Sequence, residues 1–191
     1  PGVVKPGSVD RTHMVSAVDF FPTVLEAVGI PVPGGVDGRS FLPLLRGEAQ
    51  PERDVVFKQV DYLIGGPARP MRAIEGKRFL YIFNPWSRDG AGYRNNNEGN
   101  TMKAMMAAAE NDPILAERIR FFRDRHPEEF YDLLKDPGCL NNLILQPEYA
   151  GKVEKFRQQM EKWMIQTKDP TLTMFTHRSL PERIQEEMKE F

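Results

Sequence analysis

The feature that most constrains this chain of 191 residues is a one-sided apolar stripe in residues 147–166. Apolar side chains recur there at spacings of three and four residues, which is typical of an amphipathic helix. The stripe consists of Tyr149, Val153, Phe156, Met160, Trp163 and Met164. Such a helix is stable when another layer covers its apolar side. The rest of the chain therefore has to supply a surface on which this helix packs.

The covering layer is expected to be a small sheet. A strand opens at residues 55–57, residues 71–74 and 79–83 form a hairpin with a tight turn at residues 75–77, and residues 129–133 form a further strand. These segments are rich in β-branched and aromatic residues, which favour strands. The sequence therefore predicts an α+β fold, in which a small antiparallel β-sheet packs with helices on one face.

Two short helices and turn-rich loops are expected in residues 1–50. Pro22 and Pro43 have no backbone N–H and are tolerated only in a first helical turn, so each helix begins close before its proline. Asp19 is the expected N-cap of the first helix, and Ser40 is the expected N-cap of the second. This region therefore differs in character from the sheet that follows it.

Further helices complete the predicted architecture. Residues 100–124 form two helical pieces that are broken at Asp112-Pro113, and a tail helix covers residues 180–190. The expected divisions of the chain are residues 1–50, residues 51–170 and residues 171–191.

Charge and hydropathy exclude some classes of partner. The chain has 26 Lys and Arg against 27 Asp and Glu, a net charge of −1, so neither nucleic acid nor a membrane surface is expected as its main partner. No apolar run approaches the roughly 20 residues of a membrane span. We recognise no signal peptide, and the chain opens at Pro1 without an initiator Met. We interpret it as a piece of a longer protein.

Few residues have the chemistry of a catalytic centre. The single cysteine, Cys139, excludes an internal disulfide, and its place in a turn favours an inert thiol. The three histidines, His13, His126 and His177, are widely spaced, and none belongs to a two-histidine helical pair. We therefore expect no metal site in this chain.

A more promising group flanks the Gly- and Pro-containing segment 62–70, which is expected to be a loop between strands. The group consists of Asp61, Tyr62, Arg69 and Arg72. Binding residues often lie on loops at strand ends, and a pair of arginines can hold a sulfate or a carboxylate in a forked geometry. The alternative is that Arg72 forms a structural ion pair and the others are solvated.

Several segments together resemble the C-terminal part of the sulfatase family, in the alkaline phosphatase superfamily. Residues 18–29 look like the Asp-x-x-Pro-Thr helix near the end of the catalytic domain. The other matching segments are residues 37–47, 53–57, 70–74, 81–84, 129–133, 136–137 and 142–143. The long helical insertion before Tyr131 and the ending from Trp163 to Pro170 are most similar to the heparan N-sulfatase (sulfamidase) branch.

The resemblance implies a sulfuric ester hydrolase with two domains. Its N-terminal α/β domain carries a formylglycine, made from the first residue of a C-x-P-x-R motif, and a calcium ion. That motif is absent here, because position 141 after Cys139 is Asn and position 143 is Leu. The catalytic residues, calcium and formylglycine are therefore expected upstream of Pro1, and the isolated chain is expected to be inactive.

The resemblance also implies partners and a location. The expected partners are the missing N-terminal catalytic domain and a sulfated carbohydrate such as a glycosaminoglycan, and the expected location is extracytoplasmic: periplasmic, secreted or lysosomal. The candidate substrate-binding residues lie at the edge formed by residues 59–72. They are Gln59, Asp61, Tyr62 and Arg72.

Two other functions remain open at this point. One is a stand-alone binding or assembly module, and the other is part of a phosphate or phosphonate ester hydrolase of the same superfamily. Apolar residues surround the helix within residues 14–30 almost completely, so this surface is expected to be covered by the missing domain. The isolated chain is therefore expected to self-associate, for example as a homo-oligomer, or to be only marginally stable.

Overall fold

The computed structural model describes residues 2–62, 66–87 and 99–191. The chain forms two compact units. The first contains residues 1–57 with the turn at residues 75–78, and the second contains residues 58–74 and 79–191. The architecture is α+β, as the sequence predicts.

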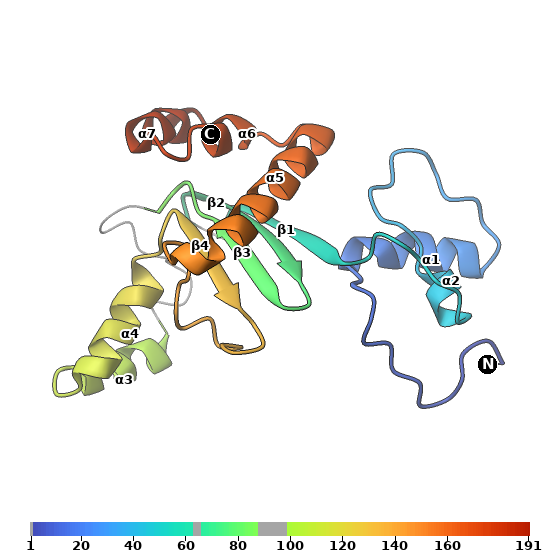
Figure 1. The fold of residues 1–191 in the computed structure, drawn as a ribbon, viewed down its shortest axis with the longest axis horizontal. Coiled ribbons are helices and arrows are strands. Elements are labelled where there is room, and N and C mark those ends of the chain that lie inside the picture. Colours follow the sequence, from blue (N-terminus) through green and yellow to red (C-terminus); the bar gives the residue numbers. More distant parts are fainter. Residues whose placement is uncertain (1, 63–65, 88–98) are drawn as a thin grey trace. The chain divides into compact units, whose positions relative to one another are not determined.

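The sheet has four strands in the order β1-β2-β3-β4 (Figure 1). The strands are β1 (Val55–Tyr62), β2 (Ala68–Gly76), β3 (Phe79–Phe83) and β4 (Glu128–Asp132). β3 and β4 pair antiparallel, with Tyr81 opposite Phe130. The predicted loop at residues 62–70 is too long, because β1 continues to Tyr62 and β2 already begins at Ala68. The φ angle that Pro70 imposes is compatible with extended backbone, so it does not interrupt β2.

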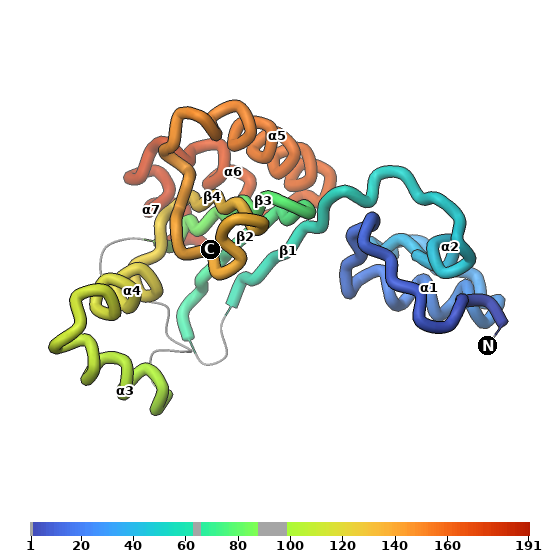
Figure 2. Tube along the Cα trace, turned by 60° about the horizontal axis from the view of Figure 1, so that its bottom comes forward, coloured from blue at the N-terminus to red at the C-terminus, as the bar shows by residue number. Residues whose placement is uncertain are grey.

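Helix α5 (Ala150–Thr167) covers one face of this sheet (Figures 1 and 2). A short 3₁₀ helix, η2 (Pro147–Tyr149), leads into it. Phe156 of α5 meets Phe130 edge-on, with ring centroids 5.5 Å apart, and Phe130 stacks on Phe79 at 5.3 Å. The predicted stripe is confirmed, because Val153, Phe156, Met160 and Met164 are buried.

The remaining helices of the second unit extend this core. α6 (Leu172–Thr176) places the buried Phe175 edge-on against Tyr81 and Phe83, and α7 (Pro181–Glu190) follows it. α3 (Asn100–Ala109) and α4 (Pro113–Arg123) pack on each other. The predicted break between them is confirmed, since the carboxylate of Asp112 caps α4 by accepting the N–H groups of its first turn.

The first unit holds a 3₁₀ helix, η1 (Ala17–Asp19), and the helices α1 (Phe20–Ala27) and α2 (Leu42–Leu45). Asp19 occupies the N-cap position of α1, as predicted, but its side chain makes no capping hydrogen bond to that helix. Its carboxylate instead accepts the N–H groups of Ser16 and Arg39 and a hydrogen bond from Arg53 at 2.8 Å. A buried guanidinium 34 residues away thus determines the role of Asp19.

A glycine allows the segment before α2 to lie against η1, and a serine near the start of α2 contributes a hydrogen bond. A Cβ atom at Gly38 would come within 1.9 Å of the carbonyl oxygen of Val18, so only glycine fits there. The N-cap of α2 is Phe41, one residue after the predicted Ser40. The Ser40 hydroxyl still accepts the N–H of Leu42, at 3.1 Å.

In the described part of the chain, no helix combines the length and the apolar character needed to cross a membrane.

Candidate functional site

Two of the four predicted substrate-binding residues meet in a buried ion-pair cluster. Nη1 of Arg72 lies 2.7 Å from Oδ1 of Asp61 on the neighbouring strand, and its Nε donates to Oδ2 of Asp169 at 2.6 Å. Only 1% of Arg72 is exposed, and its Nη1 also donates to the carbonyl oxygens of Val60 and Met71. This is the geometry of a structural ion pair, and a contact of Arg72 with substrate stays a prediction.

The other two predicted residues lie on the exposed part of β1. Gln59 is exposed beside a hollow in the sheet. Tyr62 is 64% exposed and stacks on the C-terminal Phe191, with ring centroids 5.9 Å apart. The strand therefore presents Gln59, Asp61 and Tyr62 within four successive positions, and Arg72 holds only Asp61 among them.

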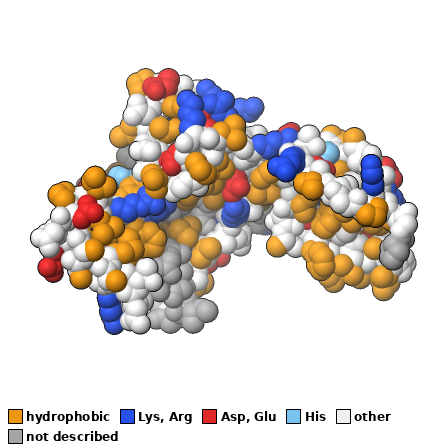
Figure 3. All heavy atoms as spheres, turned by 90° about the horizontal axis from the view of Figure 1, so that it is seen from below, with side chains coloured by type: hydrophobic (Ala, Val, Ile, Leu, Met, Phe, Trp, Pro, Cys, Tyr) orange, Lys and Arg blue, Asp and Glu red, His pale blue; other side chains and the backbone are white. Residues whose placement is uncertain are grey.

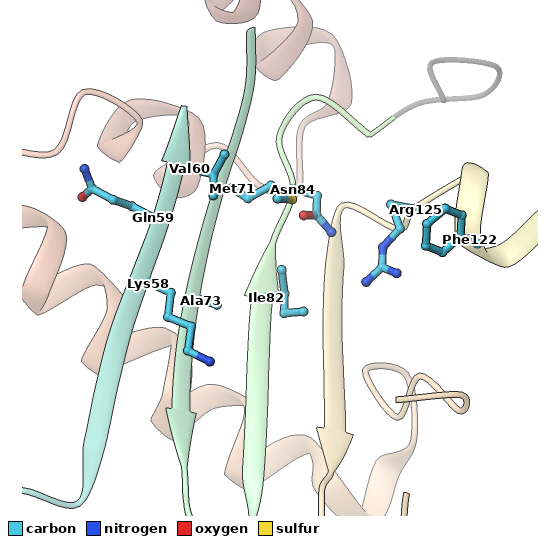
Figure 4. A pocket seen from close by; sticks show the side chains of 9 residues that line it. All are labelled: Lys58, Gln59, Val60, Met71, Ala73, Ile82, Asn84, Phe122 and Arg125. Carbon is cyan, nitrogen blue, oxygen red and sulfur yellow. The ribbon is translucent and has the colours of Figure 1, made fainter. Parts of the chain in front are cut away.

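The hollow beside Gln59 has a volume of about 310 Å³ and opens on the sheet face opposite α5 (Figure 4). Lys58 of β1, Ala73 of β2 and Ile82 of β3 form its floor, and Arg125 and Phe122 close it on the side of α4 (Figure 4). The complete lining consists of Lys58, Gln59, Val60, Met71, Ala73, Ile82, Asn84, Phe122 and Arg125. The wall is mostly apolar, with cations and amides at its rim.

A polar network that the sequence did not suggest borders this hollow. Glu129 is fully buried, and its carboxylate pairs with Arg125 and accepts hydrogen bonds from Asn84 at 3.0 Å and from the Tyr131 hydroxyl at 2.7 Å. Burial, and then the charge of Glu129, raises the pKa of Tyr131 well above its ordinary range, so its hydroxyl remains a donor. The charge of Glu129 is therefore satisfied within the fold and is not available as a general base.

The amide of Asn84 is oriented by the same network. Its Nδ2 donates to Glu129 and to the backbone carbonyl of His126, at 2.9 Å, whereas its buried Oδ1 accepts no hydrogen bond from a described residue. A carbonyl oxygen at the edge of the hollow can accept a hydroxyl or an amide N–H from a bound group. The hollow can thus accept a hydrogen bond from a bound group, and its described lining includes no Ser, Thr, Cys, Asp or Glu side chain.

The residues described by the structure include no group of three His, Cys, Asp or Glu side chains placed to hold a metal ion. His13 pairs with Asp10 at 2.7 Å, and His177 pairs with Glu187 at 2.6 Å. The described residues therefore do not provide the ligand set for the calcium ion that the resemblance implies.

Known proteins match the chain along most of its length. The model of the family described as N-sulphoglucosamine sulphohydrolase, C-terminal, matches residues 1–117. The chain is 31% identical to an ulvan-active sulfatase of Formosa agariphila over 167 residues, which cover 86% of this chain and 31% of that protein. It is 29% identical to the N-sulphoglucosamine sulphohydrolase of Homo sapiens over 178 residues, covering 86% of this chain and 34% of that protein.

A solved structure supports the same fold. A 2-O GAG sulfatase superposes with a TM-score of 0.61 at 23% identity, covering 90% of this chain and 29% of that one. The chain spans about a third of the length of the curated relatives it matches. Since the family model covers more than half of the chain, the resemblance drawn from the sequence is confirmed: the chain belongs to the sulfatases, as a member of the N-sulphoglucosamine sulphohydrolase C-terminal family.

Proposed function

We propose that this chain is the C-terminal region of a sulfatase that removes sulfate from a sulfated sugar. The family match over residues 1–117 carries this proposal, and sulfatases among the matching relatives support it. Those relatives are about three times as long as the matched region. Their additional length leaves room for a catalytic domain. In this proposal, that domain supplies the nucleophile.

The proposed division of labour leaves catalysis to the other domain. Calcium and formylglycine belong to that domain in this proposal, because Cys139 is not followed by the C-x-P-x-R pattern and the described residues offer no calcium ligand set. The isolated chain is therefore inactive, and its contribution is to complete and to shape the site.

The first unit is the proposed contact with the catalytic domain. Phe20, Val24 and Val28 are spaced four residues apart and form a stripe along α1, and they are 63%, 42% and 63% exposed. Figure 3 shows hydrophobic side chains gathered at the surface of this unit. An apolar stripe of this kind is stabilised by a covering partner, which in this proposal is the rest of the catalytic domain, with residues 1–50 as the last segment of that domain.

The proposed contribution to the substrate is the exposed part of β1. Gln59 and Tyr62 project from one strand, and the buried Arg72 holds Asp61 between them at 2.7 Å. Amide, carboxylate and phenol groups can all bind sugar hydroxyls. Arg72 then acts as a positioning residue, which holds the strand that carries the other three.

The test begins with the gene that contains this sequence, expressed in full and assayed for sulfate release from sulfated sugars. We expect activity from the full-length protein and none from the 191-residue chain. Hydrolysis of phosphate or phosphonate esters in preference to sulfate esters would contradict the proposal and favour the phosphate branch of the superfamily. Activity of the isolated chain would contradict the division of labour.

The role of β1 is tested in the same full-length protein. We expect Gln59→Ala to raise KM roughly tenfold with little change in kcat, because a hydrogen bond to the substrate's sugar is lost. Gln158→Ala is the matched control, since Gln158 is an exposed glutamine on α5, outside β1 and outside the lining of the hollow. Equal KM values for the two variants would remove Gln59 from the substrate site.

A further inference from the structure

A second hollow, of about 270 Å³, lies in the second unit against helix α7. β2 contributes Arg69 near its start, the segment after β3 contributes Trp86, and the C-terminal segment contributes Arg178, Gln185 and Lys189. We call this hollow the α7 pocket. Pro127, just before β4, completes the lining, so four segments that are distant in sequence meet around one small cavity.

The α7 pocket has a strongly cationic lining. Arg69, Arg178 and Lys189 line it, and none of its described lining residues is acidic. The whole chain has a net charge of −1, so the pocket is opposite in sign to the chain as a whole. A cavity whose walls carry one sign of charge concentrates the electric field and attracts ions of the opposite sign. The lining therefore favours an anionic ligand.

The charge of Arg178 is only weakly compensated by the acidic residue beside it. Its Nε lies 3.9 Å from Oε1 of Glu128. That carboxylate already accepts hydrogen bonds from Arg157 at 2.8 and 2.9 Å and from the Tyr81 hydroxyl at 2.6 Å. Arg178 itself donates to the backbone carbonyl of Phe175 at 2.9 Å. An anion in the pocket would thus gain a guanidinium whose charge Glu128 does not neutralise.

An aromatic ring lies next to these cations. Trp86 is 3% exposed, and the guanidinium carbon of Arg69 lies 5.3 Å from the centroid of its ring. This cation–π contact holds Arg69 in place at the pocket wall. Trp86 thus positions a cation at the wall, and the hydroxyls of a bound sugar can pair with the amide of Gln185. The lining therefore combines the groups that an anionic sugar requires.

Several contacts fix α7 as the outer wall of the pocket. Ile184 is buried, His177 pairs with Glu187 at 2.6 Å, and Phe191 stacks on Tyr62. A wall that is already ordered does not have to lose conformational entropy when a ligand binds. α7 also connects the pocket to Tyr62, at the end of the strand proposed above to contact the substrate.

We propose that the α7 pocket binds one negatively charged sugar residue of the substrate, with its sulfate or carboxylate group on the arginine and lysine side chains and its ring beside Trp86. Ligand pockets usually measure roughly 300–1,000 Å³, and a cavity of about 270 Å³, just below that range, suits a ligand as small as a single sugar unit. The choice of a sugar rests on the proposed function, whereas the anionic charge follows from the lining residues.

Binding is measured by tryptophan fluorescence in the 191-residue chain with the substitution Trp163→Phe, which leaves Trp86 as its only tryptophan. The probes are glucosamine 6-sulfate, glucuronate, N-acetylglucosamine and sodium sulfate. We expect saturable binding of a charged sugar that weakens with added salt, and roughly tenfold weaker binding of the neutral sugar and of inorganic sulfate. The tighter of the two charged sugars identifies the anionic group, sulfate or carboxylate.

Variants with matched charge changes connect this signal to the pocket. Arg178→Met and Lys189→Met each remove one cation, and we expect each to weaken binding about tenfold. Arg183→Met removes a cation from α7 outside the pocket, where the side chain is 66% exposed, and we expect no change. Lys189 is exposed, so its substitution is informative even if Arg178→Met destabilises the fold. Equal affinities of all three variants would overturn the proposal, as would equal binding of neutral and charged sugars.

The binding test of the α7 pocket and the sulfate-release test of the proposed function can fail independently. If the full-length protein releases sulfate but no probe binds the α7 pocket, the pocket assignment fails and the sulfatase assignment stands. If charged sugars bind but no sulfate is released, the pocket assignment stands as a binding site and the proposed function fails.

Discussion

The buried link between Arg72 and Asp169 allows a quantitative test of what holds the second unit together. Oδ2 of Asp169 accepts from Nε of Arg72 at 2.6 Å, while its Oδ1 accepts from the N–H and the hydroxyl of Thr171 at 2.8 and 2.7 Å. The substitution Asp169→Asn keeps the shape of the side chain but leaves one oxygen. If that oxygen stays with Thr171, the new amide nitrogen faces the guanidinium as a second donor.

The expected cost follows from burial. The side chains of Arg72 and Asp169 are 1% and 2% exposed, so water cannot replace the lost carboxylate. Removing one partner of such a pair costs roughly 3–5 kcal/mol, because an uncompensated charge stays buried. Asp61 also contacts Arg72, but its side chain is 29% exposed. Asp61→Asn is therefore expected to cost about 1 kcal/mol or less, since solvent screens that pair.

The assay is urea unfolding followed by tryptophan fluorescence, because Trp86 and Trp163 both lie in the second unit. The double variant Arg72→Met/Asp169→Asn completes a double-mutant cycle. We expect it to lose less stability than the sum of the two single variants, since the only charge left without its partner is Asp61, which is 29% exposed and therefore solvated. Additive losses, or equal small losses for Asp169→Asn and Asp61→Asn, would refute this account of the cluster.

Two further predictions concern the first unit. Burial opposes ionisation of Asp19, but hydrogen bonds from the N–H groups of Arg39 and Ser16 and the Arg53 guanidinium outweigh it and hold the pKa of Asp19 below its ordinary value of 3.8. A lowered pKa stabilises the fold above that value. Hydrogen exchange of residues 14–53, corrected for intrinsic rates, should therefore show protection that falls as the pH drops below 3.8 in the parent chain but not in Asp19→Asn. The exposed stripe on α1 predicts that the 191-residue chain associates in a concentration-dependent way in sedimentation velocity. The substitution Phe20→Ser should reduce this association. A monomer at all concentrations would contradict the proposal that a partner covers this surface.

The parts of the fold that could be predicted from sequence are those with a local signal. The period of the stripe at residues 147–166 predicted α5 and its buried side, and the proline in Asp112-Pro113 predicted the start of α4. Both depend on residues within one or two turns of each other. Strand ends were harder to place: β2 begins at Ala68, because pairing with a neighbouring strand extends a strand beyond its local preference.

The interactions that could not be predicted join residues far apart in the chain. Arg53 meets Asp19 across 34 positions, and Arg72 meets Asp169 across 97. The sequence predicts the N-cap position of Asp19, because a carboxylate before a helix usually has that role. It does not predict that the carboxylate pairs with Arg53 instead of with the first turn of α1. The α7 pocket could not be predicted from the sequence for the same reason. Arg69 and Arg178 line one cavity only because the C-terminal segment packs beside the sheet.

The residues that identify this family and the residues that would recognise a substrate are therefore different sets. Asp19, Arg53, Arg72 and Asp169 lie in the segments that carry the resemblance, and each is at most 7% exposed and engaged in an ion pair within the fold. Such residues are under structural constraint whatever the sugar. Under the proposed function, substrate preference is set instead by side chains that reach a cavity or the solvent, such as Gln59 and the cations of the α7 pocket. We therefore expect that exchanging these residues between relatives changes the preferred sugar without changing the fold.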